Sequence, residues 1–140
     1  AVGHYVNSIM ANQSKGFRAE YRDDKHSSYD MLKTEGILTL ENNVFSDVSA
    51  DIADLIFSKA EAGTLPTDAA TVCADHYTNN GNSIENLTLT DEAPIPAAIT
   101  ATGTASSDTW FDNVTYLGAF MPGGTNWAAG WTRLSEEHAW

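Results

Sequence analysis

Hydrophobic and polar residues alternate over several short stretches of the chain, which predicts β-strands separated by polar turns. The stretch GILTLENNVFS, residues 36–46, alternates from Ile37 to Leu40 and then breaks at two asparagines. The other stretches share a high content of Val, Ile, Leu, Thr, Phe and Tyr. In full, the expected strands are residues 4–10, 16–22, 36–46, 83–90 and 110–120.

Helical periodicity is confined to two stretches. In SDVSADIADLIFSKAEAG, residues 46–63, Ile52, Leu55 and Ile56 fall on one face of a helix, and Gly63 is a plausible end. The stretch TDAATVCADHY, residues 67–77, gives a weaker helical pattern because its apolar residues are small. We therefore expect one helix as an insertion among strands, and a second helical stretch after it.

Asparagine recurs beside β-forming residues at Asn7, Asn43, Asn86 and Asn113, at unequal intervals along the chain. At the corners of a parallel β-solenoid, asparagine amides can satisfy backbone groups and stack from coil to coil. The pattern thus predicts a mainly β fold, a parallel β-helix or solenoid with coils of about 20–25 residues and a helical insertion. A β-sandwich is the alternative.

The composition argues against several classes of function. The 140-residue chain has only 7 Lys and Arg against 19 Asp and Glu, a net charge of −12. Such a surface lacks the cations that nucleic acids and anionic lipids require, and no apolar run is long enough to cross a bilayer. We expect no nucleic-acid partner and no membrane insertion. The acidic surface does attract hard cations such as Ca²⁺.

Candidate catalytic and metal-binding residues are few. In YRDDKHSSYD, residues 21–30, three carboxylates are the candidate Ca²⁺ ligands, with a solvated loop as the alternative: Asp23, Asp24 and Asp30. Adjacent carboxylates on a strand point to opposite faces, so Asp23 and Asp24 do not form a glycosidase pair. Cys73 and His76 could form a nucleophile pair, but a buried structural cysteine explains Cys73 more simply. No catalytic residue is assigned.

Residues 112–132, DNVTYLGAFMPGGTNWAAGWT, contain two tryptophans four positions apart, Trp127 and Trp131. This stretch resembles the C-terminal segment of large secreted bacterial proteins built as right-handed parallel β-helices. The resemblance implies a secreted or cell-surface location in bacteria and a β-helix architecture, without implying a reaction. The residues that carry it are Val114, Tyr116, Gly118, Ala119, Trp127, Gly130, Trp131 and Thr132.

The tryptophans admit two interpretations. As a cap, residues 112–140 would cover the open end of the last coil. As a platform, Trp110, Trp127 and Trp131 would stack against sugar rings. We expect residues 1–140 to form one domain, the terminal coils of a larger β-helix.

The expected function is a non-enzymatic extracellular or cell-surface structural protein. The chain would be the terminal part of a β-helix, joined to the upstream part of its precursor, or a protomer that self-associates into filaments. Residues 1–22 would supply the contact in either case, because the edge of the N-terminal strand is expected to be unpaired. The alternatives are a carbohydrate-binding module and a polysaccharide-acting β-helix enzyme.

Overall fold

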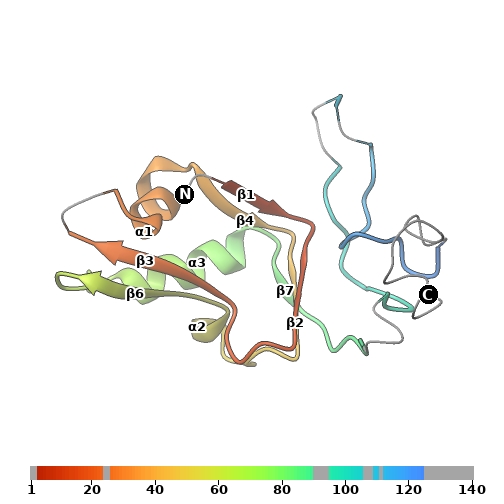
Figure 1. The fold of residues 1–140 in the computed structure, drawn as a ribbon, viewed down its shortest axis with the longest axis horizontal. Helices are drawn as coiled ribbons and strands as arrows, with labels where there is room; N and C mark the ends of the chain where they lie inside the picture. Colours follow the sequence, from red (N-terminus) through yellow and green to blue (C-terminus); the bar gives the residue numbers. More distant parts are fainter. Residues whose placement is uncertain (1–2, 24–25, 90–94, 106–108, 111, 125–140) are drawn as a thin grey trace, which may run out of the picture.

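The computed structural model describes residues 3–23, 26–89, 95–105, 109–110 and 112–124. The fold is built from short strands and a few helices (Figure 1). The strands are β1 (Gly3–Val6), β2 (Ile9–Ala11), β3 (Phe17–Arg22), β4 (Leu38–Glu41), β5 (Val44–Ser46), β6 (Ile56–Ala62) and β7 (Ser83–Ile84). The helical segments are α1 (Ser28–Asp30), η1 (Met31–Glu35), α2 (Ile52–Leu55) and α3 (Ala69–Asn79).

The described strands form three small parallel sheets, with the orders β1-β4, β2-β5-β7 and β3-β6. In the first sheet Gly3 lies opposite Leu38, and in the second Val44 lies opposite Ser83. The chain thus passes through the three sheet positions in the same order more than once. We call residues 3–22 the first rung, residues 38–62 the second rung and residues 83–89 the third rung.

Left-handed backbone marks the corners between successive strands of a rung. Asn7, Asn42 and Gly81 have φ values of 52°, 52° and 69° and precede β2, β5 and β7 respectively. Asn12 and Asp47, with φ values of 57° and 51°, follow β2 and β5. Glycine and the short polar residues Asn and Asp adopt this conformation most readily, which explains their repeated use here.

The main core lies between the sheets, where α3 packs between the β3-β6 sheet and the β1-β4 sheet (Figure 1). Phe45 of β5 and Tyr77 of α3 are buried, with ring centroids 5.9 Å apart. Inward residues of the second rung are essentially inaccessible to solvent: Leu40, Phe45 and Ile56. Helix α3 therefore supplies part of the interior that the strands enclose.

A capping box starts the helical segment between β3 and β4. The Ser27 hydroxyl accepts from the Asp30 N–H, and the Asp30 carboxylate accepts from the Ser27 N–H at 3.2 Å. Gly36, at φ 61°, ends the segment in the left-handed conformation. Tyr29 of α1 is buried beside Ala19 of β3, so this segment also closes part of the core.

A third cluster covers the outer face of the β2-β5-β7 sheet. Val44 is fully buried under Leu87 and Leu117, and Ile9 packs against the same group. The Glu85 carboxylate accepts hydrogen bonds from the backbone N–H groups of residues 100 and 101. The segment after the third rung is thereby held against the outside of this sheet.

The helix predicted over residues 46–63 is wrong. Only Ile52–Leu55 is helical, and the chain then enters β6, where Ile56 lies opposite Phe17. Strand pairing over Ile56–Ala62 outweighs a helical periodicity that rested on three residues. The weaker helical prediction, residues 67–77, is confirmed by α3.

The strand predictions hold in part. Residues 16–22 contain β3, whereas residues 4–10 and 36–46 are each divided into two strands by an asparagine corner. Residues 83–90 contribute only β7, and the described residues 112–120 form no strand. All described pairings are parallel, unlike the antiparallel sheets of the alternative β-sandwich. The described structure is mixed, with short strands in small parallel sheets and few helices.

Candidate functional site: the exposed edge of the first rung

The three strands of the first rung, β1, β2 and β3, each lie at the edge of their sheet. In β1, the Gly3 N–H donates to the Ile37 carbonyl at 3.1 Å, and the Asn7 N–H donates to the Glu41 carbonyl at 3.2 Å. Successive residues of a strand direct their backbone groups to opposite sides. Between these two donors, β1 therefore also directs backbone groups away from the second rung, toward a side on which no described strand pairs with it.

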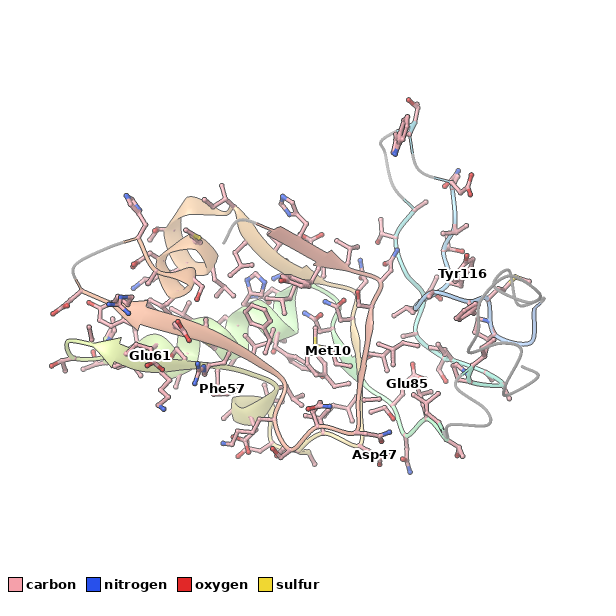
Figure 2. All side chains as sticks on the ribbon, viewed as in Figure 1. Met10, Asp47, Phe57, Glu61, Glu85 and Tyr116 are labelled. Carbon is pink, nitrogen blue, oxygen red and sulfur yellow. The ribbon has the colours of Figure 1, made fainter. Side chains whose placement is uncertain are left out.

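The inward side chains of β1 and β2 are only partly covered, whereas Ala19 of β3 is fully buried beside Tyr29 of α1. Tyr5 is 45% exposed, although Leu40 at the equivalent position of the second rung is fully buried. Met10 is half-buried, whereas Phe45 opposite it is fully buried. Figure 2 shows Met10 pointing into the space between the sheets. The Tyr5 ring lies 5.5 Å from the ring of Phe17, so the first rung presents an aromatic, half-covered end of the core.

The other side of β4 is blocked by side chains that follow in the sequence. His76 of α3 accepts a hydrogen bond from the Leu40 N–H through Nε2 at 3.1 Å. The Asn82 amide donates to the Leu40 carbonyl at 2.8 Å. Burial lowers the pKa of His76, while the nearby Glu41 carboxylate opposes that shift. The neutral imidazole is the form that can accept this bond.

Asn43 joins the three rungs at the first corner. Its side chain is fully buried; its Oδ1 accepts from the Ser8 N–H at 2.9 Å, and its Nδ2 donates to the Tyr5 carbonyl at 2.9 Å. The same Nδ2 donates to Oδ1 of Asn82 at 3.1 Å. The predicted corner role of Asn43 is confirmed, because its amide satisfies backbone groups and ladders to the next rung.

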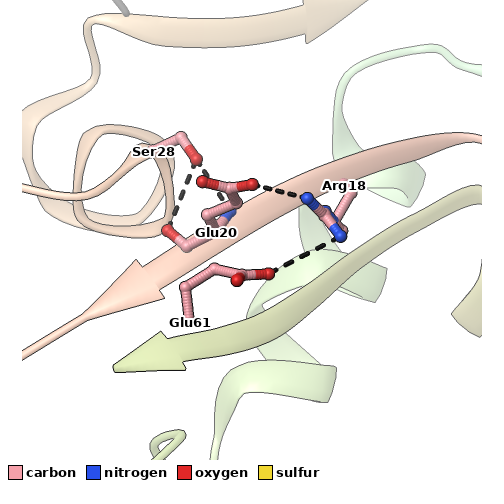
Figure 3. A network of polar contacts seen from close by, with 4 residues as sticks. All are labelled: Arg18, Glu20, Ser28 and Glu61. Atoms are coloured by element: carbon pink, nitrogen blue, oxygen red, sulfur yellow. Dashed lines mark hydrogen bonds and ion pairs between the residues drawn. The ribbon is translucent and has the colours of Figure 1, made fainter. Parts of the chain in front are cut away.

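The outer face of the β3-β6 sheet carries charged side chains (Figure 3) beside the half-buried ring of Phe57. Arg18 bonds to Glu20 at 2.5 Å and to Glu61 at 3.6 Å, and the Ser28 hydroxyl accepts from the Glu20 N–H. The side chains of these ion pairs are partly exposed, so each pair contributes only about 0–1 kcal/mol to stability. The outer face of the β2-β5-β7 sheet differs, because it is covered by the apolar cluster around Val44.

An open groove of about 550 Å³ runs beside β2. Val6 and Ile9 lie on one side, and Tyr116 and Phe120 on the other. Figure 2 shows Tyr116 on the segment outside the sheets. The Gly118 N–H donates to the Asn7 carbonyl at 2.7 Å, which fixes this outer wall to the corner of the first rung.

The predicted tryptophan sites are tested only at one position. Trp110 is 86% exposed. Trp127 and Trp131 lie outside the described residues, so both the cap and the sugar platform stay predictions. The described part of the predicted cap, residues 112–124, contacts the corner at Asn7 through Gly118.

The predicted Ca²⁺ ligands have different surroundings. The Asp30 carboxylate is bonded to Ser27 in the capping box, and Asp23 is exposed and lies against Gly63. Asp24 lies outside the described residues. Within the described part of the chain, no group of three or more His, Cys, Asp or Glu side chains is placed to hold a metal ion. The Ca²⁺ site stays a prediction.

Cys73 and His76 do not act on each other in this structure. The Cys73 thiol is buried, its pKa is raised by burial, and its hydrogen-bond partner is Ser58. His76 bonds to the backbone of Leu40. Both residues have structural surroundings, as the simpler interpretation of Cys73 predicted.

Sequence reasoning missed the roles of Asn42, His76 and Asn82. The missed signal is a repeated hexapeptide: NSIMAN from Asn7, NNVFSD from Asn42 and GNSIEN from Gly81. The strands inside the three copies, β2, β5 and β7, pair with one another in the register of the repeat.

Comparisons with models of protein families, with curated protein sequences and with solved structures found no match to this chain. Among the described residues, none of the helices combines the length and the apolar character that crossing a bilayer requires.

Proposed function

We propose that the chain is a non-enzymatic structural segment of a right-handed parallel β-helix, in which a preceding coil of the same polypeptide covers the first rung. The observation that carries the proposal is the difference between equivalent inward residues, since Tyr5 is 45% exposed and Leu40 is fully buried. The first rung covers the second, and a further coil in the same register would cover the first in the same way.

Two observations favour a preceding coil over a second copy of the chain. Each chain carries a net charge of −12, so two copies repel each other. The far side of β4 is occupied by His76 and Asn82, and Asp75, Thr78 and Asn79 are exposed on α3. In a head-to-tail filament, the polar surface of α3 and the blocked side of β4 would have to cover the aromatic end at Tyr5 of the next copy. These two surfaces do not match, which disfavours the filament.

The proposed location, a secreted or surface protein of bacteria, follows from the resemblance of residues 112–132 to the ends of such β-helices. In that setting the chain contributes length and a finished end to a larger rod. The acidic surface supports this role by keeping neighbouring rods apart.

A tandem duplication tests the proposal. Because Gly3 pairs with Leu38, repeating residues 3–37 directly before Gly3 adds one rung in register. We expect the added rung to raise the melting temperature by several degrees and to slow amide exchange in the native β1 and β2. The control carries Tyr5→Asp and Phe17→Asp in the added copy only.

The outcomes separate the alternatives. Equal exchange in the native β1 and β2 with either insertion would show that the first rung does not accept a further coil. Sedimentation of the native chain over a concentration series tests the second-copy alternative. Concentration-dependent growth would favour the filament.

Carbohydrate binding is the second candidate, favoured by the 86% exposure of Trp110. Exposed indole rings supply stacking surfaces for apolar faces of ligands. A change of tryptophan fluorescence on adding oligosaccharides, lost in Trp110→Ala, would support this function. An unchanged spectrum across a range of oligosaccharides would argue against it.

A further inference from the structure

We infer that the coil preceding the first rung is recognised through its middle strand, which would seat in the groove beside β2 with both faces covered by apolar side chains. The inference rests on the proposed function and adds which strand of the coil determines the fit. A second strand of the coil would lie on β1, where its outer face meets solvent; at β3 the Ser28 hydroxyl already bonds to the N–H and the carbonyl of Glu20.

The groove lies against the outer face of β2, the edge strand of its sheet, and Leu89 also lines it. Val6 and Ile9 of the first rung line one side, and the segment with Tyr116 and Phe120 lines the other. The hydrogen bond from the Gly118 N–H to the Asn7 carbonyl, 2.7 Å long, holds this segment beside the corner. The outer face of a strand added to the edge of β2 would therefore contact the apolar side chains of this segment.

The existing rungs show how such a strand is covered. In the second rung Phe45 points inward to the core, and Val44 points outward, where Leu117 helps to bury it completely. In the first rung Met10 and Ile9 occupy the same two positions. Strands covered on both faces need consecutive apolar residues rather than an alternating pattern.

The other two sheets make no such demand. On the outer face of the β1-β4 sheet, His4 bonds to Thr39 at 2.7 Å in an exposed position. On the outer face of the β3-β6 sheet, Arg18 bonds to Glu61. A strand added above β1 can therefore carry polar or charged outward residues.

The repeated hexapeptide describes the strand that fits. A left-handed residue, Asn or Gly, comes first, and a small polar residue follows it. In the two copies that form β2 and β5, the next two residues are apolar, Ile9-Met10 and Val44-Phe45. The occupant of the groove is thus predicted to be a middle strand of this pattern, supplied by the preceding coil.

The test uses the full chain with residues 3–37 duplicated. In the added copy, Ile9→Lys would place a charge in the groove, whereas the matched change His4→Lys would place one on the exposed outer face above β1. We expect Ile9→Lys to abolish most of the gain in melting temperature and His4→Lys to retain it. Equal retention by both variants would overturn the inference. Failure of the unsubstituted duplication to stabilise would instead count against the proposed function.

A double-mutant cycle distinguishes loss of the groove contact from a failure of the added rung to fold. Its changes are Ile9→Ala in the added copy and Tyr116→Ala in the outer wall. If the strand seats in the groove, Tyr116→Ala should lower the melting temperature more in the duplicated chain than in the native chain, and the two changes should couple. Strictly additive effects would show that the strand does not meet the wall.

Discussion

Replacing Asn43 by alanine is the sharpest test of how the rungs are held together. The Asn43 side chain is fully buried and bonds to the Ser8 N–H, the Tyr5 carbonyl and the side-chain oxygen of Asn82. Alanine removes all of these side-chain bonds, and among their partners the Asn82 oxygen keeps a bond at this corner, to the backbone N–H of residue 43 at 3.1 Å. The change therefore loosens the first rung from the second and the second from the third.

The magnitude follows from the surroundings of each partner. A buried polar group that loses its only partner costs about 1–3 kcal/mol. The Tyr5 side of the corner lies near the open edge and can be rehydrated, so its share falls at the low end. Ser8 and Asn82 are partly buried, and the lost side-chain volume adds a small cavity term. We expect Asn43→Ala to lower the free energy of unfolding by about 3–4 kcal/mol.

The neighbouring position provides a matched control. Asn42 is partly buried, has φ 52°, and its amide donates to the Thr104 hydroxyl at 2.8 Å. Asn42→Gly loses this one partly exposed bond but gains a residue suited to the left-handed conformation. The two effects oppose each other, so the expected change is within about 1 kcal/mol.

Urea unfolding of the two variants and the native chain, followed by far-UV circular dichroism, measures both changes. Similar m-values for the three proteins are needed, so that a shifted midpoint reports stability. A loss below about 1 kcal/mol for Asn43→Ala, or a loss equal to that of Asn42→Gly, would refute the idea that this amide couples the rungs.

Three further predictions concern the interior. Burial lowers the pKa of His76, so the neutral imidazole stabilises the fold above pH about 6.5. This contribution should be lost as the pH falls through the lower pKa of the folded state. The substitution His76→Gln should therefore flatten the pH dependence of the melting temperature between about pH 7 and pH 5. A Cβ at Gly16 would overlap the Leu55 carbonyl oxygen, whereas one at Gly36 meets nothing within 4 Å, so Gly16→Ala should lower the melting temperature far more than Gly36→Ala, and equal effects would contradict the structure. The Cys73 thiol is buried with a raised pKa, so it should react with a thiol reagent such as dithionitrobenzoate only after unfolding, and rapid reaction in the native chain would place it at the surface.

The sequence carried the local strand signals and the use of asparagine at corners. The break of residues 36–46 at two asparagines corresponds to the corner between β4 and β5. Asn43 performs the predicted stacking role. Asn7 instead aligns with Asn42, one position earlier, and Asn113 is exposed outside any described strand. The irregular spacing came from comparing residues that are not equivalent.

The length of the repeat could not be read from asparagine alone. The predicted coils are shorter than the observed repeat, in which Gly3 pairs with Leu38 and Val44 with Ser83. The difference lies in the helical segments that connect β3 to β4 and β6 to β7. Their helicity depends on tertiary burial, because Ala69 and Cys73 of α3 pack against residues distant in sequence. Small apolar residues give little helical periodicity, although they fit a narrow interior.

The sequence predicted the unpaired strand edge of the candidate site but not the groove beside it. The expected unpaired strand in residues 4–10 corresponds to β1 and β2, which have no described strand on one side. The groove beside β2 was missed because its outer wall comes from residues 114–120, near the opposite end of the chain. Only tertiary structure brings such distant segments together, and no local pattern marks them.

The edges of β4 and β1 that face away from each other differ in whether their backbone groups are already bonded, so the two sides of this sheet are not equivalent. At β4, side chains of His76 and Asn82 occupy both backbone groups of Leu40, and blocked edges resist strand addition. At β1, the backbone groups that point away from β4 meet no described strand, and the inward ring of Tyr5 stays half-covered. If both ends accepted further coils, a half-buried histidine bonded to the strand backbone at one of them would hinder the addition. At the β1-β4 sheet, this difference supports the proposal that a further coil adds to β1 and not to the far side of β4.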